Sequence, residues 1–142
     1  MTSFIYNVCK KSFLDGAIDL NNDTINVALV SSAYAPDKDG DLAYDDLTNE
    51  VAQSGGYLTG GKALSNTGVT QDNVNNRASF DGDDVTWETA TINARAAVLY
   101  KDTGTPSSST LIAYIDFGQD YQSTGGDFTI QWSSDGIFYL GE

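Results

Sequence analysis

Histidine is absent from this sequence of 142 residues, and cysteine occurs only once, at Cys9. The absence of histidine excludes serine–histidine and cysteine–histidine catalysis, histidine-ligated metal sites and any imidazole pH switch. A single cysteine cannot form an internal disulfide, so packing must hold the fold, and nothing points to an oxidising compartment. We therefore expect Cys9 to act as a small buried hydrophobic residue.

Basic residues are also scarce, because seven Lys and Arg stand against 20 Asp and Glu and give a formal net charge of -13. A chain of this charge repels phosphate backbones and anionic lipid headgroups, so we expect neither nucleic acid nor a membrane as a partner. Long apolar runs are missing, and Lys10 and Lys11 follow the short apolar stretch at the N-terminus, whereas a signal peptide has its cations first. The sequence therefore predicts neither a signal peptide nor a membrane anchor.

The length predicts a single domain over residues 1–142. Apolar residues recur at helical spacing near the N-terminus, at Ile5, Val8, Cys9 and Phe13. Residues 1–16 are therefore expected to form a short helix, with Ser3 as its cap and Gly16 as its stop. The remainder, residues 24–142, is expected to form a β domain with long loops.

Several segments of this β domain have the alternation or the continuous apolar character of strands. Residues 24–30, 91–100 and 111–117 are the clearest of them, and the last two are expected to form a central antiparallel pair. A turn at Ser133–Gly136 separates residues 128–132 from residues 137–140, which predicts a C-terminal hairpin. The predicted class is mainly β, an antiparallel β-sandwich or jelly-roll-like arrangement with one short N-terminal α-helix.

The middle of the chain is less regular. Residues 77–80 are expected to pair with residues 83–89 across Gly82. The segment 55–76 is rich in Gly, Asn and Thr, and we interpret it as a long excursion with short strands around 63–64 and 69–70.

The acidic residues offer two kinds of candidate chemistry. Asp37, Asp39 and Asp41 alternate along a turn, which is one way to gather oxygen ligands for calcium. An EF-hand is excluded because Gly40 and Thr48 stand at the wrong positions, so the alternatives are a looser calcium site and a solvated loop tip. Paired carboxylates could also serve glycoside hydrolysis, but sequence spacing cannot establish the separation that this mechanism needs. We expect no catalytic residue, no cofactor and no enzyme activity.

Two further features have simple structural readings. The glycines before Lys62 resemble a phosphate loop, but Ala63 stands where that motif needs Ser or Thr, so these glycines are expected to make tight turns. Arg95 lies inside an apolar strand, and we expect it to pair with a carboxylate rather than to bind an anion.

Taken together, the segments resemble a family of small structural proteins of tailed bacteriophages and prophages. The resemblance runs in order through residues 13–20, 25–36, 60–64, 83–87, 94–100, 111–117 and 128–132. It implies a virion component, most similar to a capsid cement or decoration protein, with no catalytic residues. The implied partner is the major capsid protein, and the implied oligomer is a trimer. The implied location is the host cytoplasm before assembly and the capsid surface in the virion.

On this reading the chain works through its contact surfaces. The N-terminal segment with Phe4, Ile5 and Val8 is expected either to pack under the sheet or to contact another subunit. Tyr34 and Tyr44 are expected to be aromatic anchors of a second interface on the loop 33–44, so Tyr34→Ala should weaken attachment and leave the fold intact.

Two other functions remain open from the sequence. A tail fibre or baseplate adaptor would contact the host surface through exposed Tyr and Trp rings, which are stacking platforms for sugars. A lysis-related glycan hydrolase would depend on a particular Asp, and we expect no such activity.

Overall fold

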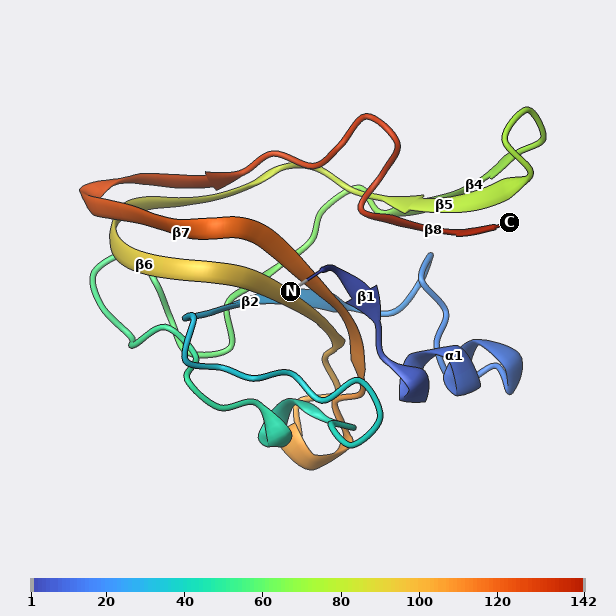
Figure 1. Cartoon of the computed structure of the whole chain (residues 1–142), viewed down its shortest axis with the longest axis horizontal. Helices are drawn as coiled ribbons and strands as arrows, with labels where there is room; N and C mark the ends of the chain where they lie inside the picture. Colours follow the sequence, from blue (N-terminus) through green and yellow to red (C-terminus); the bar gives the residue numbers. More distant parts are fainter. Residues whose placement is uncertain (1, 142) are drawn as a thin grey trace.

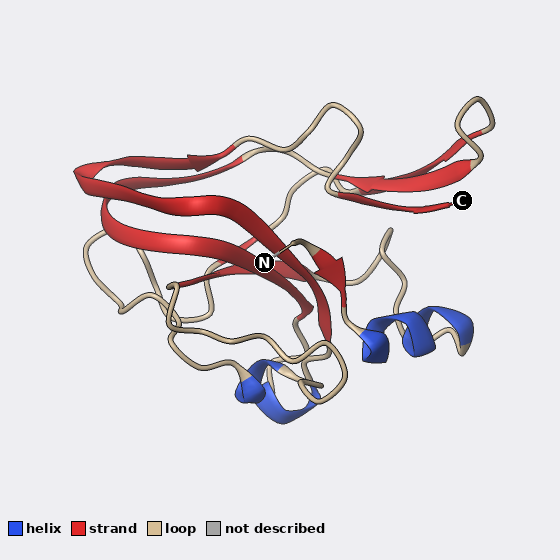
Figure 2. Ribbon diagram, in the orientation of Figure 1, coloured by secondary structure: helices blue, strands red, loops and turns tan. Residues whose placement is uncertain are grey.

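Antiparallel strands make up most of the computed structural model, which describes residues 2–141 (Figure 1, Figure 2). The elements are β1 (Phe4–Ile5), α1 (Asn7–Leu14), β2 (Ile25–Val30), η1 (Tyr44–Asp46), β3 (Lys62–Ala63), β4 (Gly68–Asp72), β5 (Arg77–Asp81), β6 (Val85–Lys101), η2 (Pro106–Ser108), β7 (Leu111–Ile130) and β8 (Phe138–Gly141). The five-stranded sheet has the order β1-β7-β6-β2-β3, and the three-stranded sheet has the order β4-β5-β8. The predicted class, mainly β with antiparallel sheets and one short helix, is confirmed. In the described part of the chain, no helix is long and apolar enough to cross a membrane.

The central feature is a long hairpin of β6 and β7 that bends back over itself (Figure 1). Its strands pair from Tyr100 and Leu111 at the closed end to Val85 and Ile130 at the open end. The register shifts four times along the way, and Thr89 has a φ of 49° at one of these irregularities, between Trp87 and Ala90. Because such bulges bend a strand and increase its twist, the same two strands contribute to both layers of the sandwich.

The five-stranded sheet is covered on both faces. One face packs against the bent end of the hairpin and the three-stranded sheet, in a core that includes Leu29, Trp87 and Phe128. The other face is covered by the chain around Tyr34 and Tyr44, which closes a second, smaller core. Burial on both faces explains why β2 and the inner halves of β6 and β7 have nearly continuous apolar sequences.

The N-terminus differs from its prediction. Phe4 and Ile5 form a strand paired with Tyr114 and Ala113, so the helix begins only at Asn7. Alternate strand residues face opposite sides, and accordingly Phe4 packs on the second core while Ile5 packs on the first. The predicted cap is also wrong, because the hydroxyl of Ser3 accepts a hydrogen bond of 2.9 Å from the backbone N–H of Asp116. The predicted stop is confirmed, since Gly16 follows the helix with a φ of 75°.

Two of the strand pairings predicted from the sequence are wrong, namely that of residues 128–132 with 137–140 and that of residues 77–80 with 83–89. The turn at Ser133–Gly136 exists, with a hydrogen bond of 2.9 Å between its ends, but β8 leaves it to pair with β5. The segment 77–81 likewise lies between β4 and β8 and does not pair with β6. Both predictions assumed that segments adjacent in the sequence pair, whereas the ends of β6 and β7 pair with each other and β5 pairs with β4 and β8 in the separate three-stranded sheet.

Candidate functional site

The predicted N-terminal contact residues lie against their own chain. The ring of Phe4 lies with its centroid 5.1 Å from that of Tyr6 and 5.4 Å from that of Tyr114. Val8 packs on the same core, and Ile5 packs on the opposite face of the sheet. All three predicted residues, Phe4, Ile5 and Val8, are half-buried. These contacts match the alternative in which the segment packs on the sheet, and a contact with another subunit stays a prediction.

Tyr34 is not an exposed anchor. Its side chain is 5% exposed, and its hydroxyl group lies 2.9 Å from the hydroxyl of Tyr6 and donates a hydrogen bond of 2.6 Å to Asp41. Burial, together with the hydrogen bond to the Asp41 carboxylate, raises the pKa of Tyr34, which therefore stays protonated. The expectation that Tyr34→Ala spares the fold is corrected, because this side chain ties the loop to the second core.

We accordingly expect Tyr34→Ala to lower the free energy of unfolding by about 3 kcal/mol or more, because it removes a buried ring. Tyr34→Phe should cost about 1–3 kcal/mol, since it keeps the ring but leaves Asp41 and Tyr6 without this hydroxyl partner. Urea denaturation followed by tryptophan fluorescence measures both. An unchanged midpoint for Tyr34→Ala would restore the original expectation.

Tyr44 belongs to a polar cluster that the sequence did not reveal. Its hydroxyl donates a hydrogen bond to the carboxylate of Glu50, and the hydroxyl of Tyr57 donates to the same carboxylate at 3.0 Å. The backbone N–H of Gly60 donates a third hydrogen bond to it at 2.7 Å. One carboxylate thus holds η1 and the loop residues Tyr57 and Gly60 together, and no local sequence pattern indicates a contact of this kind.

The three aspartates of the candidate calcium turn use their oxygens within the protein. Asp37 accepts hydrogen bonds from the backbone N–H groups of Asp39 and Gly40, both at 3.0 Å. Asp41 accepts from the backbone of Asp37 as well as from Tyr34, and Asp39 accepts from the side-chain amide of Asn7. Over residues 2–141, no three Cys, Asp or Glu side chains gather in a way that could hold a metal ion. The geometry describes a self-capped acidic turn.

Cys9 and Arg95 take the structural roles expected of them. Burial raises the pKa of the Cys9 thiol to about 12, so the thiolate form is suppressed. Arg95 donates a hydrogen bond of 2.8 Å to Asp116, and this contact lowers the pKa of the Asp116 carboxyl group. The prediction that Arg95 pairs with a carboxylate is confirmed.

Few of the acidic groups in residues 2–141 have a cationic partner. Ion pairs with Lys or Arg in this part of the chain involve five of its acidic residues, namely Asp15, Asp23, Asp72, Asp116 and Asp135. The exterior is therefore strongly negative, and any protein that binds it closely needs a complementary, positively charged surface.

An apolar groove of about 430 Å³ interrupts this acidic exterior between the three-stranded sheet and the segment that includes the end of α1. Phe13, Phe80 and Phe138 line it, together with Val69 and Leu140. Val69 and Leu140 are 45% and 47% exposed although they lie on the inner face of their sheet. The sheet is thus only partly covered, which leaves an opening suited to an apolar side chain of a partner.

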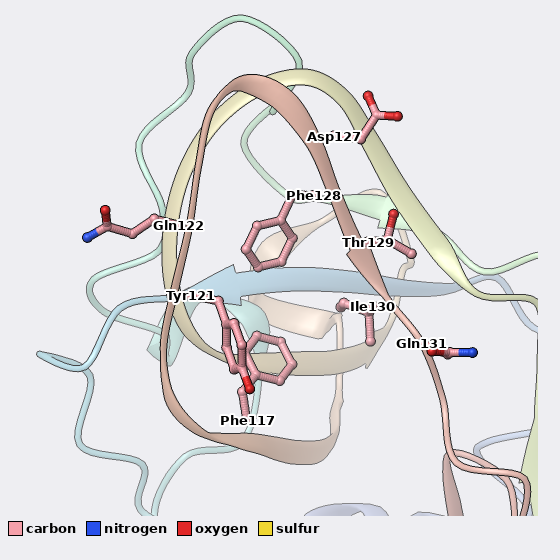
Figure 3. A pocket seen from close by; sticks show the side chains of 8 residues that line it. All are labelled: Phe117, Tyr121, Gln122, Asp127, Phe128, Thr129, Ile130 and Gln131. Atoms are coloured by element: carbon pink, nitrogen blue, oxygen red, sulfur yellow. The ribbon is translucent and has the colours of Figure 1, made fainter.

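A second cavity, of about 410 Å³, lies where β7 doubles back (Figure 3). The rings of Phe117, Tyr121 and Phe128 gather in it, with Phe117 having centroid distances of 6.2 Å to Tyr121 and 6.4 Å to Phe128. The side chains of Gln122 and Asp127 point away from these rings (Figure 3). The cavity therefore has an aromatic floor and is framed by β7 itself.

These geometric features stand without support from known relatives. Comparisons of the chain with protein-family models, with curated proteins and with solved structures each found no match.

Proposed function

We propose that this chain is a structural protein of tailed-phage particles that binds the assembled capsid as a cement or decoration protein. The observation that carries the proposal is the ordered resemblance of seven sequence segments to small virion proteins, which extends over almost the whole chain. Several of these segments form the inner strands β2, β6 and β7, so the resemblance includes the residues on which the fold depends.

The apolar groove lends physical support. A protein of net charge -13 is well solvated before assembly, yet the half-exposed Val69 and Leu140 offer apolar area that a partner can remove from water. Protein interfaces commonly combine such an apolar centre with a polar rim. This combination suits a chain that is soluble alone and useful once bound to a large assembly.

The protein would stabilise the capsid through thermodynamic linkage between its own binding and capsid assembly. A protein that binds the assembled lattice but not its dissociated subunits stabilises the lattice by the free energy of its own binding. Three copies around a three-fold axis of the capsid, the proposed oligomer, would repeat each contact with the lattice. The major capsid protein is the proposed partner, and the capsid surface is the proposed location.

Attachment provides the test. Particles made without this chain are incubated with purified protein, and the bound amount is measured by gel quantification against the major capsid protein. We expect wild-type protein to decorate the particles and Leu140→Glu to reduce occupancy by about tenfold, because it places a charge in the apolar groove. Val74→Glu is the matched control, since Val74 is exposed on the β4–β5 turn outside this groove and its replacement should leave occupancy unchanged.

Copy number in native particles separates the proposal from its alternative. An abundance comparable with that of the major capsid protein supports the shell, whereas a far smaller abundance supports a tail fibre or baseplate adaptor. Absence of the chain from purified particles would contradict both functions.

A further inference from the structure

The part of β7 after its bend, from Gly126 to Ile130, is called its second leg, and one edge of this leg is open. β1 pairs only with Ala113 and Tyr114, so for the rest of β7 the sole paired strand within residues 2–141 is β6. The leg that ends at Ile130 is regular, because Phe128, Thr129 and Ile130 pair in register with β6. A regular edge with no further neighbour can accept an additional strand through its backbone N–H and C=O groups.

The cavity beside this edge accepts an apolar side chain. Its floor consists of aromatic rings, and Tyr121, which supplies one of them, is 47% exposed. A small polar ligand needs polar groups that converge on it, but Gln122, Asp127 and Gln131 point away from the rings (Figure 3). The volume and the floor therefore favour the side chain of an added strand over a free sugar.

The acidic residues of β7 indicate which side chains should flank the apolar side chain of the added strand. β7 contains Asp116, Asp120 and Asp127 and has no Lys or Arg. Asp116 forms an ion pair with Arg95. No Lys or Arg of the described residues forms an ion pair with the exposed Asp120 or Asp127. A second copy of this chain is a poor partner, because its own net charge of -13 repels this edge.

From these three observations we infer that the edge of β7 around Asp127–Gln131, with its cavity, binds an extended segment of a partner protein in which an apolar side chain is flanked by Lys or Arg. The added strand pairs with the backbone of β7, its apolar side chain enters the cavity beside Tyr121, and its cations face Asp120 and Asp127. The inference rests on the proposed function only for the identity of the partner as a capsid protein.

The direct test uses three synthetic peptides with blocked ends, KTKFKTK, KTKSKTK and ETEFETE, titrated into the whole protein while its backbone NMR signals are followed. We expect KTKFKTK to shift the signals of residues 127–131 and of Tyr121. KTKSKTK, without the apolar side chain, and ETEFETE, with reversed charge, should each bind about tenfold more weakly or worse. Shifts that map elsewhere, or equal binding of all three peptides, would overturn the inference.

Matched variants separate the site from general charge. The double variant Asp120→Lys and Asp127→Lys should weaken KTKFKTK by about tenfold or more, and Tyr121→Ala should weaken it by about fivefold. The controls are the double variant Asp45→Lys and Asp81→Lys, on η1 and β5, which changes the net charge by the same amount at two exposed carboxylates, and Tyr139→Ala on β8, which removes a ring of 50% exposure. Both controls should stay within about twofold of wild type, and an equal loss in them would contradict a site on β7.

The same variants keep this inference distinct from the proposed function. Decoration of particles at wild-type occupancy by the β7 variants would refute the edge as the capsid contact and leave the cement function standing. Peptide binding at β7 by a protein that is absent from particles would refute the cement function and leave the edge site standing.

Discussion

Gly61→Ala is expected to be among the most destabilising single substitutions in this chain, lowering the free energy of unfolding by about 2–5 kcal/mol. Gly61 has a φ of 79°, which costs an L-residue about 1–2 kcal/mol. In addition, a Cβ atom there would lie 1.8 Å from the carbonyl oxygen of Val27 on β2, the strand that pairs with the edge strand β3. Relieving that overlap means displacing β3 from β2, an overpacking cost of about 1–3 kcal/mol. Urea denaturation measures the sum.

Gly16 provides the matched control. Its φ is 75°, almost the same as that of Gly61, but a Cβ atom there would have nothing within 4 Å. Gly16→Ala should therefore show only the conformational cost, about 1–2 kcal/mol. Asn variants separate the two costs, because Asn adopts the left-handed backbone conformation more readily than Ala does. Gly16→Asn should therefore leave the free energy of unfolding nearly unchanged, whereas Gly61→Asn should still lower it strongly. Equal midpoints for the two Asn variants would contradict the steric explanation.

The sequence allowed the strands to be recognised where burial dictates the pattern. Residues 25–30, 96–100 and 111–114 are covered on both faces, so their apolar character is nearly continuous, whereas residues 91–94 alternate between exposed and buried positions. The pairing of 91–100 with 111–117 followed from one short loop. Such features are local, and local sequence is sufficient for them.

Pairing between distant strands was not accessible in the same way. The turn at 133–136 was located correctly, yet nothing near it indicates that β8 joins β5 instead of returning along β7. The bend of the β6–β7 hairpin depends on register shifts, which arise from the whole pairing and leave no periodic signal. The strand character of Phe4 and Ile5 is likewise a tertiary effect, because their apolar spacing fits a helix equally well.

The candidate site likewise combines features that local sequence indicates with features that arise only when distant segments meet. The sequence drew attention to the aromatic residues of the loop 33–44 as interface anchors, but it could not distinguish an exposed anchor from a ring buried against Tyr6. Neither the groove beside Leu140 nor the cavity beside Tyr121 could be predicted, since each is lined by elements that meet only in the folded chain. The net charge of -13 follows directly from the sequence. It indicates the kind of partner only when it is combined with these two apolar openings.

Trp87→Ala is the second substitution expected to have a large effect, about 3–5 kcal/mol in the free energy of unfolding. Trp87 is buried in the first core, and its ring lies 5.8 Å from that of Tyr57 and 6.3 Å from that of Phe128, so truncation opens a cavity between the two layers. Trp87→Phe should cost clearly less, because a ring still fills most of the space and the indole N–H has no hydrogen-bond partner in the described part of the chain. Trp132 remains in both variants as the fluorescent reporter for urea denaturation. Leu14→Ala, which truncates an exposed side chain, should stay within about 0.5 kcal/mol of wild type, and a loss at Trp87 no larger than that would mean that the hairpin bend does not depend on this ring.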